Sequence, residues 1–416
     1  MAIDEKRNAM PGRPAPAERP AAPEMPAASG PAAPGSHVRE GSGPRPMARF
    51  EHGGDIYSHP GAVDFSANVN PLGMPAAARE ALVQAVDSFE AYPDPNCREL
   101  TQALAAREGV PTDWVLCTAG ATDLMTRACL ALRPRTALVT APCYSGYEQA
   151  LTQIGADISR HILSGTNDFA LTEEILGQVD GGIDLVFVAS PNNPTGRTVD
   201  RHLLDVLLAR AEEVGATVVL DECFIDFTTA GSAVAMAADH PNLLVMKAFT
   251  KIYAMAGLRL GYGICSNPDL MGRLRAAGQA WAVSTPAQVA GLAALGETGY
   301  LERTRTYVAG ERERLRRGMT ELGLRVVPGE ANYLLFCSDY PLYQALLDCG
   351  VIIRRCQNYF GLTGGPGAMT LPDDVTRPAA GMGDYAVRPI PFWYRVAVRT
   401  HEQNDLLLAK LREVLP

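Results

Sequence analysis

The chain has 416 residues, 47% of them hydrophobic, and a formal net charge of -9. A chain of this length can bury one large core and a smaller one, and its negative charge argues against nucleic acids and anionic membranes as main partners. The sequence contains no run of about 18 apolar residues that would cross a bilayer and no apolar signal segment at its start. We therefore expect a cytoplasmic protein.

The first part of the chain differs in composition from the rest. Ten of residues 1–46 are proline, interleaved with Ala, Gly and Ser. Such a segment buries too little apolar surface to offset the entropy that is lost on ordering. We predict a disordered tail over 1–46.

Two turn-rich motifs follow the tail. FEHGGDIY begins at Phe50, and VDFSANVNPLG runs from Val63 to Gly73. Their Asn, Pro and Gly residues are typical of an extended arm. A helix is expected near 76–88, so 47–91 is predicted to form an N-terminal arm that belongs in part to a small domain.

Apolar strands then alternate with amphipathic helices. We expect strands at 114–118, 136–141, 185–189, 217–220 and 243–246, with helices at 122–132, 144–154 and 200–214. Short apolar strands separated by helices indicate an α/β fold, in which a mostly parallel sheet is sandwiched by helices. This pattern predicts a large domain over 92–295.

The pattern changes in the last part of the chain, 296–416. A long charged helix (301–322), strands at 325–336, 351–354 and 395–398, and a final helix with a capping box at Thr400 and Gln403 are expected there. These elements predict a smaller α+β domain. Within it, 363–391 is an insertion rich in Gly and Pro whose composition fits a lid, an interface loop or disorder.

Cysteine and histidine spacing gives no sign of a metal site. The nine cysteines lie between Cys97 and Cys356 without a C-x-x-C pair, and the seven histidines are dispersed. This spacing fits neither zinc ligation nor a disulfide framework. We predict reduced cysteines and no bound metal.

The stretch LLVMKAFTKIYAMAGLRLGYGIC, from Leu243 to Cys265, contains a candidate nucleophile. Lys251 follows a buried strand, and Arg259 lies eight residues further on. A partly desolvated amine loses its charge more readily and can form a Schiff base with a carbonyl. Taken alone, the stretch fits a surface lysine in a loop better, so the assignment depends on neighbouring motifs.

The pattern T-K-x-x-x-x-x-G-L-R-L-G-Y resembles the cofactor-lysine segment of fold-type I, pyridoxal phosphate-dependent aminotransferases. Within that superfamily, the chain is most similar to threonine-phosphate decarboxylases of cobalamin synthesis and to histidinol-phosphate aminotransferases. The likeness runs from about His52 to the C-terminus. It implies that the large domain binds pyridoxal phosphate, that Lys251 forms the Schiff base, and that the enzyme is a homodimer.

The resemblance also implies a set of cofactor-binding residues. Asp221 ends an apolar strand and would keep the pyridine nitrogen protonated, which makes the ring an electron sink. Phe224 stands where most aminotransferases have a tyrosine that contacts the ring oxygen. The other implied residues are Gly120, Ala121 and Thr122 at a helix N-terminus for the phosphate, Thr250 and Arg259 for the same group, Tyr144 stacked on the ring, Asn193 on the ring oxygen, and Tyr92 at the phosphate of the other subunit.

Substrate-binding residues are implied in the arm and near the C-terminus. The HGG and FSAN motifs would line the substrate pocket, and Arg354 and Arg395 match residues that bind anionic groups. Arg399 is expected on the face of Arg395 if strand alternation continues. The full implied set is His52, Gly53, Gly54, Ser66, Asn68, Asn193, Arg354, Arg395 and Arg399.

The leading interpretation is a lyase that decarboxylates L-threonine O-3-phosphate. The alternative is an aminotransferase of histidinol phosphate or a related amino acid. The HGG arm and Phe224 favour the decarboxylase. A ligand-sensing regulator on the same fold would need a basic DNA-binding domain before the core, and the Pro-rich residues 1–46 lack its helical pattern.

Overall fold

A computed structural model describes residues 52–362 and 391–416. The predicted tail at 1–46 lies outside these residues. The insertion at 363–391 also lies outside them, except for its last residue. The described residues belong to one compact unit, so the domain boundaries given above stay predictions.

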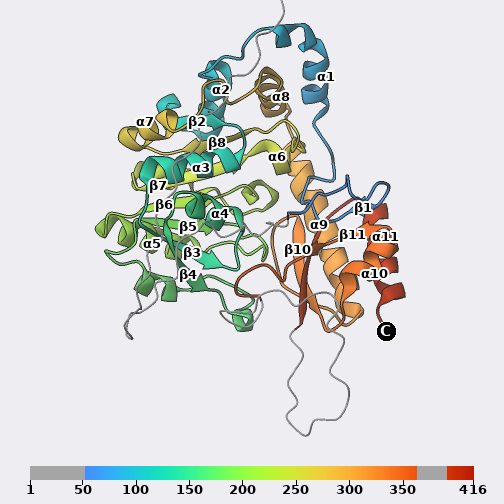
Figure 1. Cartoon of the computed structure of the whole chain (residues 1–416). Coiled ribbons are helices and arrows are strands. Elements are labelled where there is room, and N and C mark those ends of the chain that lie inside the picture. Colours follow the sequence, from blue (N-terminus) through green and yellow to red (C-terminus); the bar gives the residue numbers. More distant parts are fainter. Residues whose placement is uncertain (1–51, 363–390) are drawn as a thin grey trace, which may run out of the picture. The chain divides into compact units, whose positions relative to one another are not determined.

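A seven-stranded sheet forms the larger part of the fold (Figure 1). Every adjacent pair of strands is parallel except the two pairs that contain β8, which runs antiparallel to both of its neighbours. The prediction of a mostly parallel sheet is therefore confirmed. The spatial order is β2 (Val115–Thr118), β8 (Gly261–Ile264), β7 (Leu243–Ala248), β6 (Thr217–Asp221), β5 (Leu185–Ala189), β3 (Thr136–Ala141) and β4 (Asp157–Ile162).

Helices cover both faces of this sheet. Along β6, Val218 and Leu220 belong to one apolar cluster and Val219 to the other, as the period of two in a strand requires. The first cluster includes side chains of α2 (Arg98–Glu108), α5 (Arg201–Glu213) and α8 (Thr285–Gly296). The second includes side chains of α3 (Ala121–Leu132), α4 (Gly146–Gln153) and α7 (Pro268–Ala276).

A smaller, antiparallel sheet has its own core. Its order is β12 (Arg354–Arg355), β13 (Phe392–Ala397), β10 (Tyr333–Ser338) and β9 (Arg325–Val326). The helices α9 (Tyr300–Glu321), α10 (Leu342–Asp348) and α11 (His401–Val414) contribute to the apolar cluster around Phe336. The single strand expected at 325–336 is wrong, because Pro328 and Gly329 turn the chain between β9 and β10.

The N-terminal arm packs on the small-sheet side of the molecule, where it forms part of a separate two-stranded sheet. Strand β1 (Val63–Asp64) pairs in parallel with β11 (Val351–Ile352), and Phe65 lies in the core around Phe336.

The helix expected at 76–88 is the shorter α1 (Ala76–Gln84), followed by a 3-10 turn at Val86–Glu90. The capping box of α11 is confirmed.

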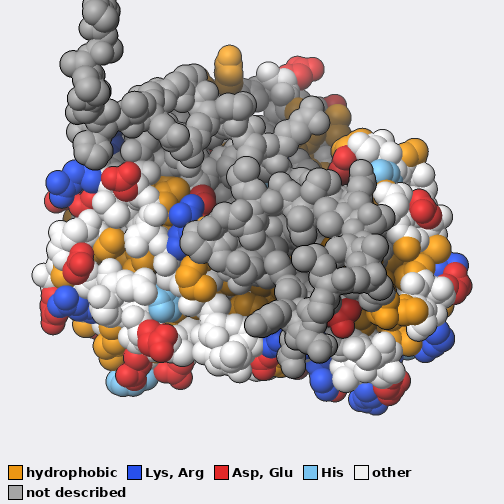
Figure 2. Space-filling model, turned by 60° about the horizontal axis from the view of Figure 1, so that its bottom comes forward, with side chains coloured by type: hydrophobic (Ala, Val, Ile, Leu, Met, Phe, Trp, Pro, Cys, Tyr) orange, Lys and Arg blue, Asp and Glu red, His pale blue; other side chains and the backbone are white. Residues whose placement is uncertain are grey.

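The described surface in the view of Figure 2 carries both acidic and basic side chains. Basic and acidic side chains are interspersed on both sides of the grey region.

Among the described helices, none has the length and hydropathy to span a membrane. The nine cysteines are all unpaired, and the described residues contain no His, Cys, Asp and Glu cluster suited to a metal ion.

Candidate active site

A pocket of about 230 Å³ lies at the carboxyl edge of the large sheet. Ala189, Asp221 and Met246, which stand at or near the ends of β5, β6 and β7, form its floor. The carboxyl ends of parallel strands are the usual ligand site of open α/β sheets. The pocket is closed by residues of the N-terminal arm (His52, Gly53, Ser66, Asn68) and of the small-sheet side (Arg354, Tyr359, Arg395).

Lys251 lies in the short helix α6 (Phe249–Ile252), which directly follows β7. Burial, together with the positive charges of Arg395 and Arg259, lowers the pKa of its amine to about 8. The arm is attached to this helix, since the backbone N–H of Asn70 donates to the carbonyl of Lys251 (3.1 Å). The site therefore holds an amine that is partly neutral near physiological pH.

Asp221 is held by donors on both carboxylate oxygens. The backbone N–H of Cys223 donates to Oδ1 (2.9 Å), and the hydroxyl of Tyr147 donates to Oδ2 (2.5 Å). Tyr147 is fully buried and stacks on Phe187, with ring centroids 4.9 Å apart. The sequence analysis missed Tyr147, and the only available signal was its position three residues after Tyr144.

An anion cradle lies between α3 and α6. Gly120 is the N-cap of α3 at φ +85°, and a Cβ atom on it would lie 2.8 Å from Nη2 of Arg259. A Cβ atom on Gly261 of β8 would lie 2.7 Å from the backbone nitrogen of Ala121. Backbone N–H groups at a helix N-terminus, together with a guanidinium group, suit a phosphate. Thr122 and the buried Thr250 also line the pocket here.

Tyr144 provides an aromatic surface above this floor. Its ring centroid lies 5.6 Å from that of Tyr147, edge to face, and 6.1 Å from the ring of His52. Burial lowers the pKa of His52, and the charge of Arg354 acts in the same direction. His52 therefore lies near both Tyr144 and Arg354.

Arg354 and Arg395 are buried residues that oppose each other across β12 and β13. Arg395 donates to Oδ1 of Asn193 and to the carbonyl of Ser66 (2.7 Å). Its buried Nε has no hydrogen-bond partner among the described residues. Arg354 donates to Asn358 (3.0 Å). Both arginines line the pocket, so two guanidinium groups lie on its small-sheet side.

Tyr359 is a second pocket residue that the sequence analysis missed. The guanidinium of Arg354 lies 5.4 Å from the centre of its ring, and the ring is buried. It stands immediately before the insertion, in a segment without a recognisable motif.

The HGG and FSAN motifs pack directly on each other. A Cβ atom on Gly53 would lie 2.2 Å from the carbonyl oxygen of Ser66, so a side chain does not fit there. The N–H of Gly54 donates to Oγ of Ser66 (2.7 Å). Gly54 supports this contact without lining the pocket, whereas the buried Asn68 lines it.

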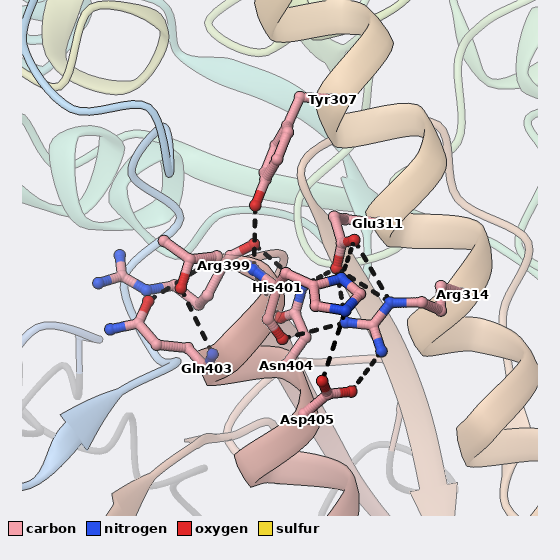
Figure 3. A network of polar contacts seen from close by, with 9 residues as sticks. Tyr307, Glu311, Arg314, Arg399, His401, Gln403, Asn404 and Asp405 are labelled. Carbon is pink, nitrogen blue, oxygen red and sulfur yellow. Dashed lines mark hydrogen bonds and ion pairs between the residues drawn. The ribbon is translucent and has the colours of Figure 1, made fainter.

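Arg399 is a correction to the expected substrate set. Strand β13 ends at Ala397, so strand alternation does not extend to Arg399, which does not line the pocket. Its backbone N–H donates to Oδ1 of Asn404 and its carbonyl accepts from Nδ2, both at 3.0 Å. Figure 3 shows Arg399 at the edge of a polar network between α9 and α11.

Tyr92 also lies away from the pocket of its own chain. Its side chain is 80% exposed, and its ring lies 4.8 Å from that of Trp281, which is 48% exposed. The two aromatic rings form an exposed pair on the surface. The role expected for Tyr92 in the site of another subunit stays a prediction.

These groups fit pyridoxal phosphate. The cofactor needs an amine, a carboxylate for its ring nitrogen, an anion cradle and an aromatic surface. Lys251, Asp221, the Gly120–Thr122 turn and Tyr144 supply one each. Asn193 would face the ring oxygen, and Thr250 and Arg259 would add to the cradle.

Comparisons with known proteins agree with this fit. The model of the family Aminotransferase class I and II matches residues 60–373. The chain is 36% identical over 384 residues to a threonine-phosphate decarboxylase of Salmonella typhimurium, covering 89% of this chain and 98% of that protein. It is 32% identical over 367 residues to histidinol-phosphate aminotransferase 1 of Cupriavidus pinatubonensis, covering 85% and 89%.

A solved structure is similar over most of the chain. The histidinol-phosphate aminotransferase of Clostridium acetobutylicum matches with a TM-score of 0.72 at 26% identity, covering 84% of this chain and 98% of that one.

Proposed function

This chain belongs to the aminotransferase class I and II family, which depends on pyridoxal phosphate. On this basis we propose that it decarboxylates L-threonine O-3-phosphate. The product would be (R)-1-amino-2-propanol O-2-phosphate, a precursor in cobalamin biosynthesis. The observation that carries the proposal is the buried pair Arg354 and Arg395 beside the HGG arm. The relative of Salmonella typhimurium, named a threonine-phosphate decarboxylase, supports it.

When bound, pyridoxal phosphate supplies a ring that withdraws electrons from the bonds at the substrate Cα. The residues of the chain determine what is bound and where protons are held. Lys251 anchors the cofactor, and its amine, with a pKa lowered to about 8 by burial, can accept or return a proton near neutral pH. Asp221, held by Tyr147 and the N–H of Cys223, keeps the proton on the ring nitrogen.

The substrate group that the arginines bind decides which bond breaks. A phosphate carries nearly two negative charges and accepts bidentate hydrogen bonds from guanidinium groups. In the proposed binding mode, Arg354 and Arg395 hold the phosphate, with His52 next to them. With both arginines on the phosphate, they would not hold the substrate carboxylate, and the bound cofactor would supply the electron sink for its loss as CO₂.

The second candidate is an aminotransferase that acts on histidinol phosphate or a related amino acid. It is supported by the 32% identity to the protein of Cupriavidus pinatubonensis, whose name gives that activity. With histidinol phosphate, which has no carboxylate at Cα, the same arginines would hold the phosphate and the amine of Lys251 would accept the Cα proton. Phe224 lines the pocket where most aminotransferases have tyrosine, which favours the decarboxylase.

Incubation of the loaded enzyme with phosphothreonine separates the two candidates. We expect CO₂ and a phosphorylated amino alcohol, with no keto acid and no need for a 2-oxo acid. The control repeats the reaction with 2-oxoglutarate and with histidinol phosphate. Stoichiometric glutamate without CO₂ would show an aminotransferase and refute the decarboxylase proposal.

We further propose a homodimer in which Tyr92 serves the pocket of the other subunit. The support is the exposure of Tyr92, whose ring lies beside that of Trp281 and away from the pocket of its own chain. Mixing a Tyr92→Phe subunit with a Lys251→Ala subunit should give hybrids that recover part of the activity, because one of the two sites is then intact. A fully active monomer in solution would refute this arrangement.

A further inference from the structure

The loop that carries Asn193 contacts the turn between β9 and β10. At this contact two glycines, Gly196 and Gly329, bring the two backbones close together. Gly196 lies in this loop at φ +74°, and Gly329 lies in the turn between β9 and β10. A Cβ atom on Gly196 would lie 2.9 Å from the Cα of Gly329. A Cβ atom on Gly329 would lie 2.9 Å from the carbonyl oxygen of Thr195. No larger residue fits at Gly329 unless one of the two backbones moves.

Hydrogen bonds hold this contact together. The backbone N–H of Glu330 donates to the carbonyl of Gly196 (2.7 Å), and the hydroxyl of Thr198 donates to the Glu330 carboxylate (2.5 Å). The Arg197 guanidinium donates to the carbonyl of Pro328 (2.9 Å). Hydrogen bonds therefore join the two segments at residues next to both glycines.

The same two segments hold groups that face each other in the pocket. Asn193 stands three residues before Gly196, and Tyr333 begins β10, which pairs with β13, the strand of Arg395. The hydroxyl of Tyr333 donates to the carbonyl of Asn192 (2.8 Å), and its ring centre lies 5.5 Å from the Arg395 guanidinium. Arg395 in turn donates to Asn193. A shift of one backbone against the other would therefore move Arg395 relative to Asn193.

We infer that Gly329 is a positioning residue, which through its contact with Gly196 sets the place of the substrate-side Arg395 relative to the cofactor-side Asn193. This inference rests on the proposed function, because it assigns Arg395 to the anionic group of the substrate. A contact that only stabilises the fold would affect melting and cofactor retention. A positioning contact affects substrate binding first, because a misplacement of about 1 Å can cost on the order of 100-fold.

The direct test is Gly329→Ala, which places a methyl group against a backbone carbonyl. We expect the loaded variant to retain the cofactor absorbance of the wild type, while KM for phosphothreonine rises about 10- to 100-fold with a smaller change in kcat. Gly177→Ala is the matched control, since Gly177 is exposed and no atom lies within 4 Å of the added Cβ. The control should keep wild-type KM and kcat.

Thr198→Val is the second variant, for the case in which Gly329→Ala does not fold. It removes one hydrogen bond to Glu330 without adding volume, so we expect KM to rise about two- to tenfold with an unchanged cofactor spectrum. A wild-type KM in Thr198→Val or in a folded Gly329→Ala would overturn the inference. Loss of cofactor without a change in KM would also overturn it.

Titration with inorganic phosphate separates this inference from the proposed function. Phosphate probes the arginine pair without turnover, and its binding to the loaded enzymes is measured by calorimetry. If the wild type binds phosphate but converts neither phosphothreonine nor histidinol phosphate, the proposed function fails, while weaker phosphate binding by the variants still supports the positioning role. Equal phosphate affinity in wild type and variants would overturn the inference whatever the substrate.

Discussion

Two polar clusters of this protein contain similar residue types but differ in how their charges are paired. Between α9 and α11, Glu311 accepts hydrogen bonds from Arg314, His401 and Asn404 (Figure 3). Arg314 also pairs with Asp405. In this network, called the α9–α11 network below, acidic and basic groups alternate and satisfy one another.

The pocket around Lys251 brings several cations together instead. Among the described residues, Lys251, Arg259, Arg354 and Arg395 line it together with the carboxylate of Asp221. Burial and the neighbouring arginines lower the pKa of Lys251, whereas the α9–α11 network lowers the pKa of its own carboxyl group, Glu311. The network therefore pairs its charges within the fold, whereas the pocket gathers groups with perturbed pKa values, as functional sites often do.

The comparison is tested most strongly at Lys251. Lys251→Ala should reduce turnover by at least about 10⁴-fold, since the group that anchors the cofactor and moves protons is lost. Borohydride treatment of the wild type should fix the cofactor to a peptide that contains Lys251, as mass spectrometry would show. Lys247→Ala is not a suitable control, because Lys247 is buried and paired with Glu108. Label on a lysine other than Lys251 would contradict the assignment.

The second test compares Arg395 with Arg399. Arg395→Ala should raise KM for phosphothreonine about 10- to 100-fold, because hydrogen bonds to a charged group are lost, while cofactor retention stays nearly unchanged. Arg399→Ala is the matched control outside the pocket, and its backbone contacts with Asn404 would persist. Steady-state kinetics and the cofactor spectrum are the measurements. An equal rise of KM in the two variants would contradict the assignment of Arg395, and not Arg399, to the pocket.

The third test uses pH. The pKa of Lys251 is lowered to about 8 from its ordinary value of 10.5, so the neutral amine predominates above about pH 8. Attachment of pyridoxal phosphate to the cofactor-free protein should therefore slow about tenfold per pH unit below 8 and level off above it. Stopped-flow absorbance measures this rate. A midpoint near 10.5 would show a solvated lysine.

The smallest effect is expected in the α9–α11 network. Partial burial opposes the charged form of Glu311, but hydrogen bonds from Arg314, His401 and Asn404 outweigh it and lower the pKa to about 2. The carboxylate therefore contributes stability above its ordinary pKa of 4.5, and this contribution is lost as the pH falls from about 4.5 towards 2.

Glu311→Gln should accordingly lower the free energy of unfolding by about 1 kcal/mol at pH 7 and leave KM and kcat unchanged. Urea unfolding at pH 7 and at pH 3 gives the two values, and the difference between wild type and variant should shrink at pH 3. A change in KM would show that the network is coupled to the pocket.

The amino-acid sequence by itself determined the elements and residues that depend on local patterns. The apolar runs at 185–189 and 217–220, the turn at Gly120, the carboxylate of Asp221 at a strand end and the capping box at Thr400 are all readable over a few positions. Side-chain period, turn chemistry and capping act between near neighbours, so the sequence states them directly.

Only the tertiary structure decided which distant side chains meet. The bond from Tyr147 to Asp221, the opposition of Arg354 and Arg395, and the contact of Gly196 with Gly329 each join segments whose spacing in the chain carries no signal. The same applies to Arg399. It does not line the pocket, because β13 ends two residues before it. Such contacts depend on strand register and on where each strand stops, and packing over long sequence separations sets both.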